Sequence, residues 1–238
     1  MLLEGLNWVL LRLDSDNVYR AEKLGELSWL DHGFGTRFSS EWPDHARLAT
    51  LRQIHSDQVL VADHAGVIGE GDALISGQPG LTLAIRTADC LPVLIADATN
   101  KAVAAVHAGW RGVVGEVAPR AIEAMARHFG TRPEDLTVVL GPGIGACCFE
   151  VGPEVAIQFA RFFPERQDLS VRTKIDLAQA VAQQLRRIGV PLGQIGPSEL
   201  CTYCQSRSFH SYRRDGDAAG RMISAIQIRE TSLDTDLK

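Results

Sequence analysis

The chain has 238 residues, of which 45% are hydrophobic, and its 24 Lys plus Arg against 29 Asp plus Glu give a net charge of -5. This composition excludes extended disorder and predicts one globular α/β domain over residues 1–238. The acidic balance argues against a nucleic-acid partner. No apolar run approaches the roughly 20 residues of a membrane helix, and residues 1–20 lack the basic start of a signal peptide, so we expect no membrane association and a cytoplasmic location.

The predicted elements follow one another irregularly along the chain. Apolar runs predict strands covered on both faces, and amphipathic segments with Pro, Asp or Gly at their ends predict helices. In chain order, the expected elements are strands over 81–85, 92–96 and 102–106, a helix over 115–129, a strand over 136–140, helices over 153–163 and 176–188, and a strand over 222–228. Because strands follow strands as often as they alternate with helices, we expect a mixed β-sheet with helices packed outside it.

Three residues at the edges of these elements could bind a metal ion: His55, Cys90 and His107. Each alone is typical of a structural residue. Cys90 lies next to one predicted strand and His107 ends the following one, so adjacent strand ends could bring the two together. Two imidazoles and a thiolate would hold zinc and leave a fourth position for water. Their separations along the chain match no zinc-finger pattern, so spacing adds little support.

The other four cysteines are interpreted as structural thiols. Five cysteines are an odd number in a chain without an export signal, which favours thiols over a disulfide framework. The adjacent Cys147 and Cys148 are expected to be buried apolar residues. The pair Cys201 and Cys204 invites a zinc-knuckle or redox interpretation, but no second CxxC motif accompanies it.

Arginines near glycine-containing turns are the candidates for phosphate binding. Arg111 follows Trp110 between two glycines, which predicts a flexible backbone there. Arg213 and Arg214 could hold phosphate through bidentate hydrogen bonds, although solvated arginines beside a turn are the simpler interpretation.

Seven ordered motifs resemble one family. They are QIHSDQV, GDALIS, TADCLPVLIAD, AAVHAGWRG, GPGIG with FEVGPEV, CTY, and SYRRDG followed by GRM. Between about residues 47 and 228 the chain resembles the YfiH family, also called the polyphenol oxidase or laccase-domain family and, in bacteria, the peptidoglycan editing factor family.

The resemblance implies a purine nucleoside phosphorylase of broad range. Such an enzyme splits adenosine, inosine and methylthioadenosine with inorganic phosphate and also deaminates adenosine. The resemblance further implies a layered α/β domain similar to the catalytic domain of cytotoxic necrotizing factor toxins. It places zinc ligands on His55, Cys90 and His107.

Roles for further residues follow as hypotheses. Phosphorolysis passes through a ribosyl cation-like state, so the enzyme must orient an anionic nucleophile against the sugar. Arg111 and either Arg213 or Arg214 are the candidates for phosphate. Deamination needs a zinc-activated water at C6 of adenine and a proton-shuttling carboxylate, for which Asp89 and Asp72 are the candidates. The further candidates for substrate contact are Gln53, Ser211 and Tyr212, together with Asp72 itself.

Three other functions stay open at the level of the sequence. His₂Cys is also the ligand set of a blue-copper site, which would make the protein a copper-dependent polyphenol oxidase. Such a site needs an axial Met, and only Met1, Met125 and Met222 are available. A metal-free cysteine hydrolase would use Cys90 as nucleophile and His107 as base. A quality-control factor for peptidoglycan precursors would bind rather than transform its ligand. The sequence does not fix the oligomeric state.

Overall fold

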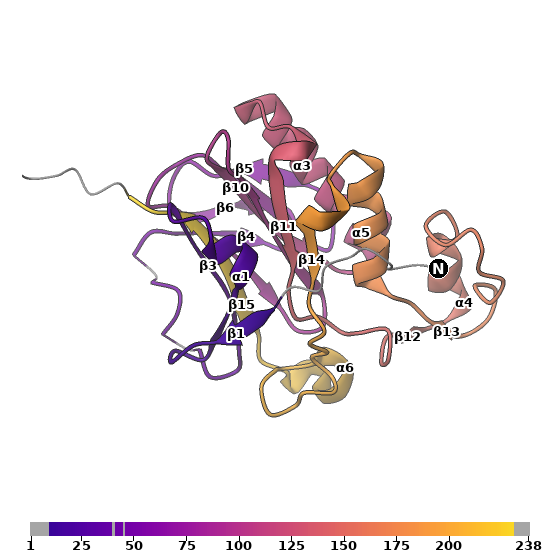
Figure 1. Ribbon diagram of the computed structural model, residues 1–238. Coiled ribbons are helices and arrows are strands. Elements are labelled where there is room, and N and C mark those ends of the chain that lie inside the picture. Colours follow the sequence, from indigo (N-terminus) through magenta and orange to yellow (C-terminus); the bar gives the residue numbers. More distant parts are fainter. Residues whose placement is uncertain (1–9, 40, 45, 231–238) are drawn as a thin grey trace, which may run out of the picture.

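The computed structural model describes residues 10–39, 41–44 and 46–230, and it arranges them in three layers (Figure 1). Two mixed β-sheets pack against each other, and helices cover the outer face of the second sheet. In spatial order, the first sheet contains β1 (Leu11–Leu13), β2 (Val18–Ala21), β3 (Leu30–Gly35), β15 (Met222–Ile228), β8 (Thr82–Thr87), β4 (Leu48–Arg52) and β6 (Gly66–Glu70). The second contains β14 (Ile195–Pro197), β11 (Leu136–Leu140), β9 (Leu91–Asp97), β10 (Ala102–Ala108), β7 (Ala73–Ser76) and β5 (Val59–Val61). A small ribbon pairs β12 (Glu150–Val151) with β13 (Thr173–Lys174).

The helices are mostly short. They are α1 (Glu22–Gly25), α2 (Trp110–Val114), α3 (Val117–Phe129), α4 (Pro153–Ala156), α5 (Leu177–Arg187) and α6 (Tyr212–Asp215), with 3₁₀ turns at Pro133–Asp135, Ile157–Phe159, Leu192–Gln194 and Gly216–Ala218. Helices α3 and α5 contact each other and cover the second sheet (Figure 1). Asp176 caps α5, as its sequence predicts, by accepting a hydrogen bond from the Gln179 N–H at 2.9 Å.

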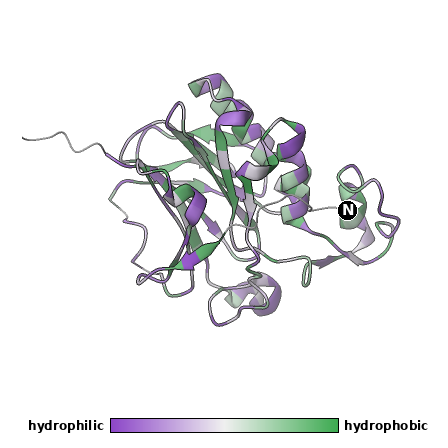
Figure 2. Ribbon diagram, in the orientation of Figure 1, coloured by the Kyte–Doolittle hydropathy of each residue, from purple (hydrophilic) through white to green (hydrophobic). Residues whose placement is uncertain are grey.

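The alternation of side chains along β10 explains the layers. Ala102, Ala104 and Val106 belong to the core beneath the helices, whereas Val103 and Ala105 belong to the core between the sheets. The strands at the centre of the molecule are accordingly apolar on both faces (Figure 2). The prediction of strands covered on two sides is confirmed. The expected single sheet is wrong, because a second sheet occupies the face opposite the helices.

Two of the expected helices are corrected. The helix predicted over 115–129 begins at Val117, and the predicted helix over 153–163 keeps only its first turn as α-helix. Beyond that turn two backbone bonds span three residues, from the N–H of Ala160 to Ile157 and from that of Phe162 to Phe159, and a third spans four, from Phe163 to Phe159. Three phenylalanines of this short segment are buried: Phe159, Phe162 and Phe163.

Within the described ranges, no helix is long and apolar enough to cross a bilayer.

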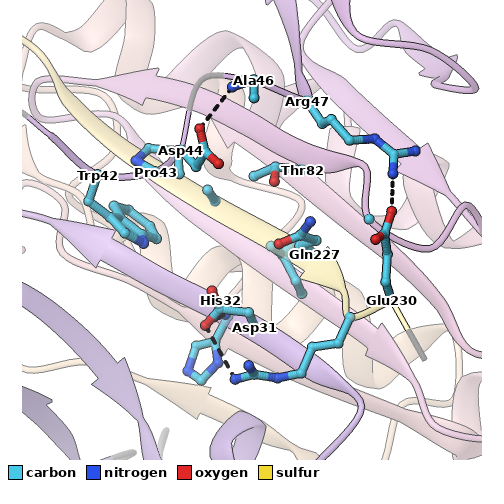
Figure 3. A pocket seen from close by; sticks show the side chains of 14 residues that line it. Asp31, His32, Trp42, Pro43, Asp44, Ala46, Arg47, Thr82, Gln227 and Glu230 are labelled. Atoms are coloured by element: carbon cyan, nitrogen blue, oxygen red, sulfur yellow. Dashed lines mark hydrogen bonds and ion pairs between the residues drawn. The ribbon is translucent and has the colours of Figure 1, made fainter. Parts of the chain in front are cut away.

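A cavity of about 560 Å³ lies on the outer side of the first sheet, under the segment that carries Trp42 and Asp44 (Figure 3). An ion pair between Arg47 and Glu230 lies at its rim. His32 is 4% exposed at this cavity, and its Nε2 accepts a hydrogen bond from the Ala21 N–H at 2.9 Å. Because the imidazole is an acceptor here, it is neutral in the folded protein.

His32 should make the protein less stable in mild acid. Burial, with the nearby charge of Arg20, lowers the pKa of His32 from 6.5 to about 4. The unfolded chain therefore binds more protons between these two values, and the free energy of unfolding falls as the pH drops through that window, by about 2–3 kcal/mol at pH ~4.5. His32→Gln keeps an acceptor but does not titrate, so urea unfolding at pH ~7 and ~4.5 should show a smaller loss. The exposed His128→Gln is the control, and an unchanged loss in His32→Gln would contradict the assignment.

Candidate active site and metal centre

The antiparallel pairing of β9 with β10 places two predicted metal ligands side by side. The pairing sets Pro92 opposite His107 and Leu91 opposite Ala108, so Cys90, directly before β9, lies beside the end of β10. His55 comes from the loop between β4 and β5. One ligand atom from each of the three residues lies within 4.8 Å of the others, and the two imidazole rings meet edge to face at 4.9 Å.

Asp72 holds both histidines in place. Its carboxylate is fully buried and accepts hydrogen bonds from His107 Nδ1 at 2.7 Å, from the His55 N–H at 3.0 Å and from Ser56 Oγ at 2.7 Å. These bonds also fix the loop at His55, whose φ of 58° is left-handed. Because Nδ1 of His107 is engaged, Nε2 is left free as the ligand atom. Asp72 therefore suits a positioning role, and its burial beneath His107 does not match the expected contact with substrate.

The pKa values of the groups in this cluster are shifted, some downward and one upward. Burial disfavours the charged form of the Cys90 thiol, but hydrogen bonds from His107 and His55 outweigh it and lower the pKa to about 6. Burial likewise opposes protonation of His107, yet its bonds to Asp72 and Cys90 raise its pKa to about 9. The pKa of Asp72 falls to about 2, because hydrogen bonds from His107 and Ser56 overcome its burial. Near neutral pH the cluster therefore holds a thiolate, the form that binds a metal.

The donor set fits zinc. Two imidazoles and a thiolate, with the second nitrogen of one imidazole bound to a carboxylate, are typical of a catalytic zinc site that leaves one position open. Gly109 supports this assignment, since a Cβ there would lie 3.1 Å from Cys90 Sγ and 3.2 Å from His55 Cδ2. A side chain at this position would crowd both candidate ligands.

Replacing Asp72 by Asn should weaken metal binding. An amide has one acceptor oxygen where a carboxylate has two. It therefore cannot accept the bonds from both His107 and the loop N–H groups, and the imidazole loses its fixed orientation. We expect about 10- to 100-fold lower zinc affinity, the usual cost of losing such a carboxylate. Zinc competition with a chromophoric chelator measures it, with the exposed Asp63→Asn as the matched control. Equal affinities in the two variants would show that Asp72 does not orient His107.

A pocket of about 800 Å³ opens over these ligands. It is lined by Leu51, Gln53, His55, Arg86, Ala88, Asp89, Cys90, His107, Trp110, Arg111, Ile144, Phe149, Tyr212, Arg213 and Arg221. Four of these residues are arginines, so the pocket is cationic in a chain that is acidic overall. Aromatic and aliphatic side chains form another part of its wall. The pocket therefore combines a surface for a flat apolar ring with several donors for an anion.

Asp89 anchors the floor of the pocket. Its Oδ1 accepts from Thr202 Oγ1 at 2.6 Å, and its Oδ2 accepts from Ser211 Oγ at 3.0 Å and from the Arg213 N–H at 2.6 Å. Both oxygens are therefore engaged: Oδ1 joins the loop before β9 to the turn after β14, and Oδ2 joins it to the start of α6. The backbone at Asp89 is also left-handed, with φ 82°. Asp89 lies next to Cys90, but its carboxylate shows the bonding of a structural anchor.

The remaining predicted site residues divide into two groups. Arg111, Tyr212 and Arg213 line the pocket, as does Gln53, whose amide forms two 2.8 Å bonds with the backbone of Arg86. Ser211 and Arg214 do not line it.

Ser211 and Arg214 support the fold around the pocket. Ser211 is fully buried and caps α6. The Arg214 guanidinium pairs with Asp215 at 2.8 Å and donates to the carbonyls of Thr202, Tyr203 and Phe209. A phosphate role for Arg214 is thus corrected, because its donors are already used.

The structure also corrects the expected flexibility at Trp110. Residues Trp110–Val114 form α2, and the Arg111 guanidinium stacks 4.4 Å from the centre of the Trp110 ring. This stacking holds the side chain of Arg111 ready at the pocket.

Sequence reasoning missed Arg86, Arg221 and Phe149. Arg86 had a visible signal, since it is the exposed position in a strand that is otherwise buried. Arg221 belongs to the GRM motif at the start of the last strand. Phe149 follows the two adjacent cysteines, and nothing in its local sequence indicates a pocket wall.

Residues 37–229 match the family described as "Multi-copper polyphenol oxidoreductase laccase". A relative from Bacteroides thetaiotaomicron named purine nucleoside phosphorylase is 41% identical over 67% of this chain and 61% of its own length. One of the same name from Deinococcus radiodurans is 42% identical over 75% of this chain and 69% of its own. A protein from an unknown prokaryote, named adenosine deaminase RL5, is 35% identical over 75% of this chain and 74% of its own.

A solved structure has the same fold. The crystal structure of the hypothetical protein YfiH from Bacillus licheniformis superposes with a TM-score of 0.82 at 27% identity, over 92% of this chain and 99% of that one. The mixed α/β architecture is therefore that of YfiH proteins.

Proposed function

Because this chain belongs to the laccase-domain (YfiH) family, whose curated relatives carry the name purine nucleoside phosphorylase, we propose that it is a zinc-dependent purine nucleoside phosphorylase that also deaminates adenosine. One observation carries the proposal. The pocket that holds His55, Cys90 and His107 also presents four arginines and an aromatic wall. A nucleoside and an inorganic phosphate need these two kinds of surface at one place.

The arginines bind and orient phosphate in this proposal. Arg111, held by Trp110, and Arg213, whose guanidinium lies 5.6 Å from the centre of the Phe149 ring, present charged donors to the same pocket. They hold an oxygen of phosphate against C1′ of the ribose, where the new C–O bond forms as the bond to the purine N9 breaks. The purine leaves with the bonding electron pair and takes up a proton, and the sugar leaves as ribose 1-phosphate.

The apolar wall positions the base. Trp110, Ile144 and Phe149 offer a dry surface on which a purine ring can pack. A zinc ion held by His55, Cys90 and His107 would act as a Lewis acid and lower the pKa of a bound water to about 7. Asp72 keeps the His107 ring in the tautomer that such an ion requires.

A product assay tests the proposal. Protein of known metal content is incubated with adenosine, with and without phosphate, and adenine, inosine, hypoxanthine and ribose 1-phosphate are resolved. We expect ribose 1-phosphate and adenine only when phosphate is present, and inosine in either case. Release of free ribose independent of phosphate would replace phosphorolysis by hydrolysis and contradict the proposal. Methylthioadenosine and inosine are the further substrates to compare.

A copper-dependent polyphenol oxidase has less support. Met125 lies in the core beneath α3, and the Met222 sulfur accepts a bond from the His210 N–H at 3.1 Å, so neither lines the pocket; Met1 is outside the described residues. In the part of the chain that the structure describes, the groups able to hold a metal are the cluster at Cys90 and a cluster of four cysteines. The histidine-rich set that several coppers require is not among them.

A metal-free cysteine hydrolase has one specific observation in its favour. The pKa values of about 6 for Cys90 and about 9 for His107 describe a thiolate beside an imidazolium, as in a cysteine nucleophile paired with its base. Chelation separates the two mechanisms, because only the zinc enzyme loses turnover when the metal is removed.

Three wider expectations stay predictions. A role in peptidoglycan-precursor quality control would show as binding of a muropeptide precursor by a protein inert toward nucleosides. A cytoplasmic location and the likeness to the catalytic domain of cytotoxic necrotizing factor toxins are the other two.

A further inference from the structure

The structure gathers the four cysteines outside the active site into one cluster: Cys147, Cys148, Cys201 and Cys204. The first two lie in the loop between β11 and β12, and the last two lie in the turn after β14. Cys147 is exposed and Cys148 is half-buried, so the expectation that both are buried apolar residues is wrong. The residues were not interpreted as a group because more than fifty positions separate the two pairs along the chain.

We propose that this four-cysteine cluster is a second, structural zinc site. All four sulfurs lie within 4.8 Å of one another, with Cys204 Sγ at 3.3 Å from Cys148 Sγ and 3.6 Å from Cys147 Sγ. A tetrahedron of sulfurs around zinc, with Zn–S bonds of about 2.3 Å, has edges of about 3.8 Å. The separations of 3.3 and 3.6 Å lie slightly below this edge, so small shifts of the side chains would complete a Zn(Cys)₄ site, and both exceed the ~2.05 Å of a disulfide bond.

The backbone around the cluster lets the two chain segments that carry the cysteines approach each other closely. The Gly145 N–H donates to Cys201 Sγ at 3.3 Å, the kind of bond that supports a sulfur carrying negative charge. A Cβ at Gly145 would lie 3.3 Å from Cys147 Sγ and 3.4 Å from Cys201 Cβ. The residue must therefore be small for the two chain segments to meet. A backbone bridge between Gly143 and Cys201 joins the same segments.

The chemistry of the site favours zinc bound for structure rather than catalysis. Four protein sulfurs fill a tetrahedral ion and leave no position for water or substrate. Binding forms four Zn–S bonds and releases four thiol protons, which leaves a local charge of 2-; no electrons are transferred. Soft thiolates select zinc over magnesium or calcium. The site differs in both respects from the cluster at Cys90, which has one sulfur and an open side.

The location gives the second zinc a function. The loop that carries Cys147 and Cys148 also carries Ile144 and Phe149, two residues of the pocket wall. The turn at Cys201 carries Thr202, which binds Asp89 at the pocket floor. A zinc ion joining the loop to the turn would fix wall and floor relative to each other without touching the substrate.

Metal analysis of a variant that lacks the first site tests the proposal independently of the enzyme's activity. Purified under reducing conditions and dialysed in zinc-buffered solution, His107→Ala should retain one zinc per chain. In the same background, Cys147→Ser with Cys204→Ser should lose it, and Cys204→His, which keeps a ligand, should retain it. Cobalt in place of zinc should give the charge-transfer absorption of several thiolates in His107→Ala and not in the double serine variant.

Two outcomes would overturn the second site. In the first, the His107→Ala protein is folded but binds no zinc, and zinc does not slow the reaction of the four thiols with an alkylating reagent. The other is a disulfide between Cys148 and Cys204 that persists in zinc-buffered reductant. To separate loss of zinc from loss of the fold, circular dichroism and thermal unfolding with and without EDTA accompany each analysis. EDTA should lower the Tm of His107→Ala but not that of the double serine variant. If the wild-type protein proves not to catalyse phosphorolysis, these measurements of zinc and thiols still decide whether the second site exists.

Discussion

Replacing His107 by Ala will remove the metal from the active site and abolish phosphorolysis. In the proposed site His107 would supply a ligand atom at the end of β10, and its Nδ1 is hydrogen-bonded to Asp72. Loss of a carboxylate that only orients a ligand costs about 10- to 100-fold in metal affinity or activity, so loss of the ligand itself should cost at least about 100-fold in kcat/KM. The substitution also leaves Asp72 buried without its main partner, which adds a loss of stability.

The matched control for this variant is His128→Ala, at an exposed position of α3. It removes the same side chain and should leave turnover unchanged. Thermal unfolding checks that His107→Ala is folded at the assay temperature. A folded variant with the activity of wild type would remove His107 from the mechanism.

Replacing Arg111 by Gln will weaken the use of phosphate. A hydrogen bond to a charged partner contributes about 1.5–3 kcal/mol, which corresponds to about 10- to 100-fold in kcat/KM for phosphate. Deamination of adenosine does not use phosphate, so it should change much less. Arg213→Gln should behave in the same way, since its guanidinium lies at the same pocket.

The control for the arginine variants is Arg127→Gln, which removes an exposed guanidinium at the end of α3. The ratio of phosphorolysis to deamination is the deciding measurement. If Arg111→Gln lowers both reactions equally, the residue supports the pocket and does not bind phosphate.

Much of the core could be predicted from the sequence, because its strands carry a continuous apolar signal. The strands at 136–140 and 222–228 begin and end where they were expected. The first sheet was missed as a separate layer, since β6 at one edge has no buried residue and β1 and β2 at the other edge are only three and four residues long. Long-range pairing, such as that of β15 with β3, leaves no local pattern.

At the site, sequence reasoning identified the residue types but not every role. His55, Cys90 and His107 come together as expected, because strand pairing brings chain-distant residues to one edge. Asp72 was taken for a substrate contact because its place beneath His107 depends on the register of β7 against β10. Arg213 and Arg214 are chemically identical neighbours, and only the turn of α6 sends one to the pocket and the other to backbone carbonyls.

The central claim is that an ion held by His55, Cys90 and His107 is required for the reaction. Zinc titration of metal-stripped protein, followed by ribose 1-phosphate formation from adenosine and phosphate, tests it most directly. We predict no phosphorolysis in the stripped protein, a return of activity once enough zinc is added to fill both clusters, and no return in His107→Ala, which keeps the four-cysteine cluster. Full activity in stripped protein, abolished by Cys90→Ser, would contradict the claim and make the thiol itself the nucleophile.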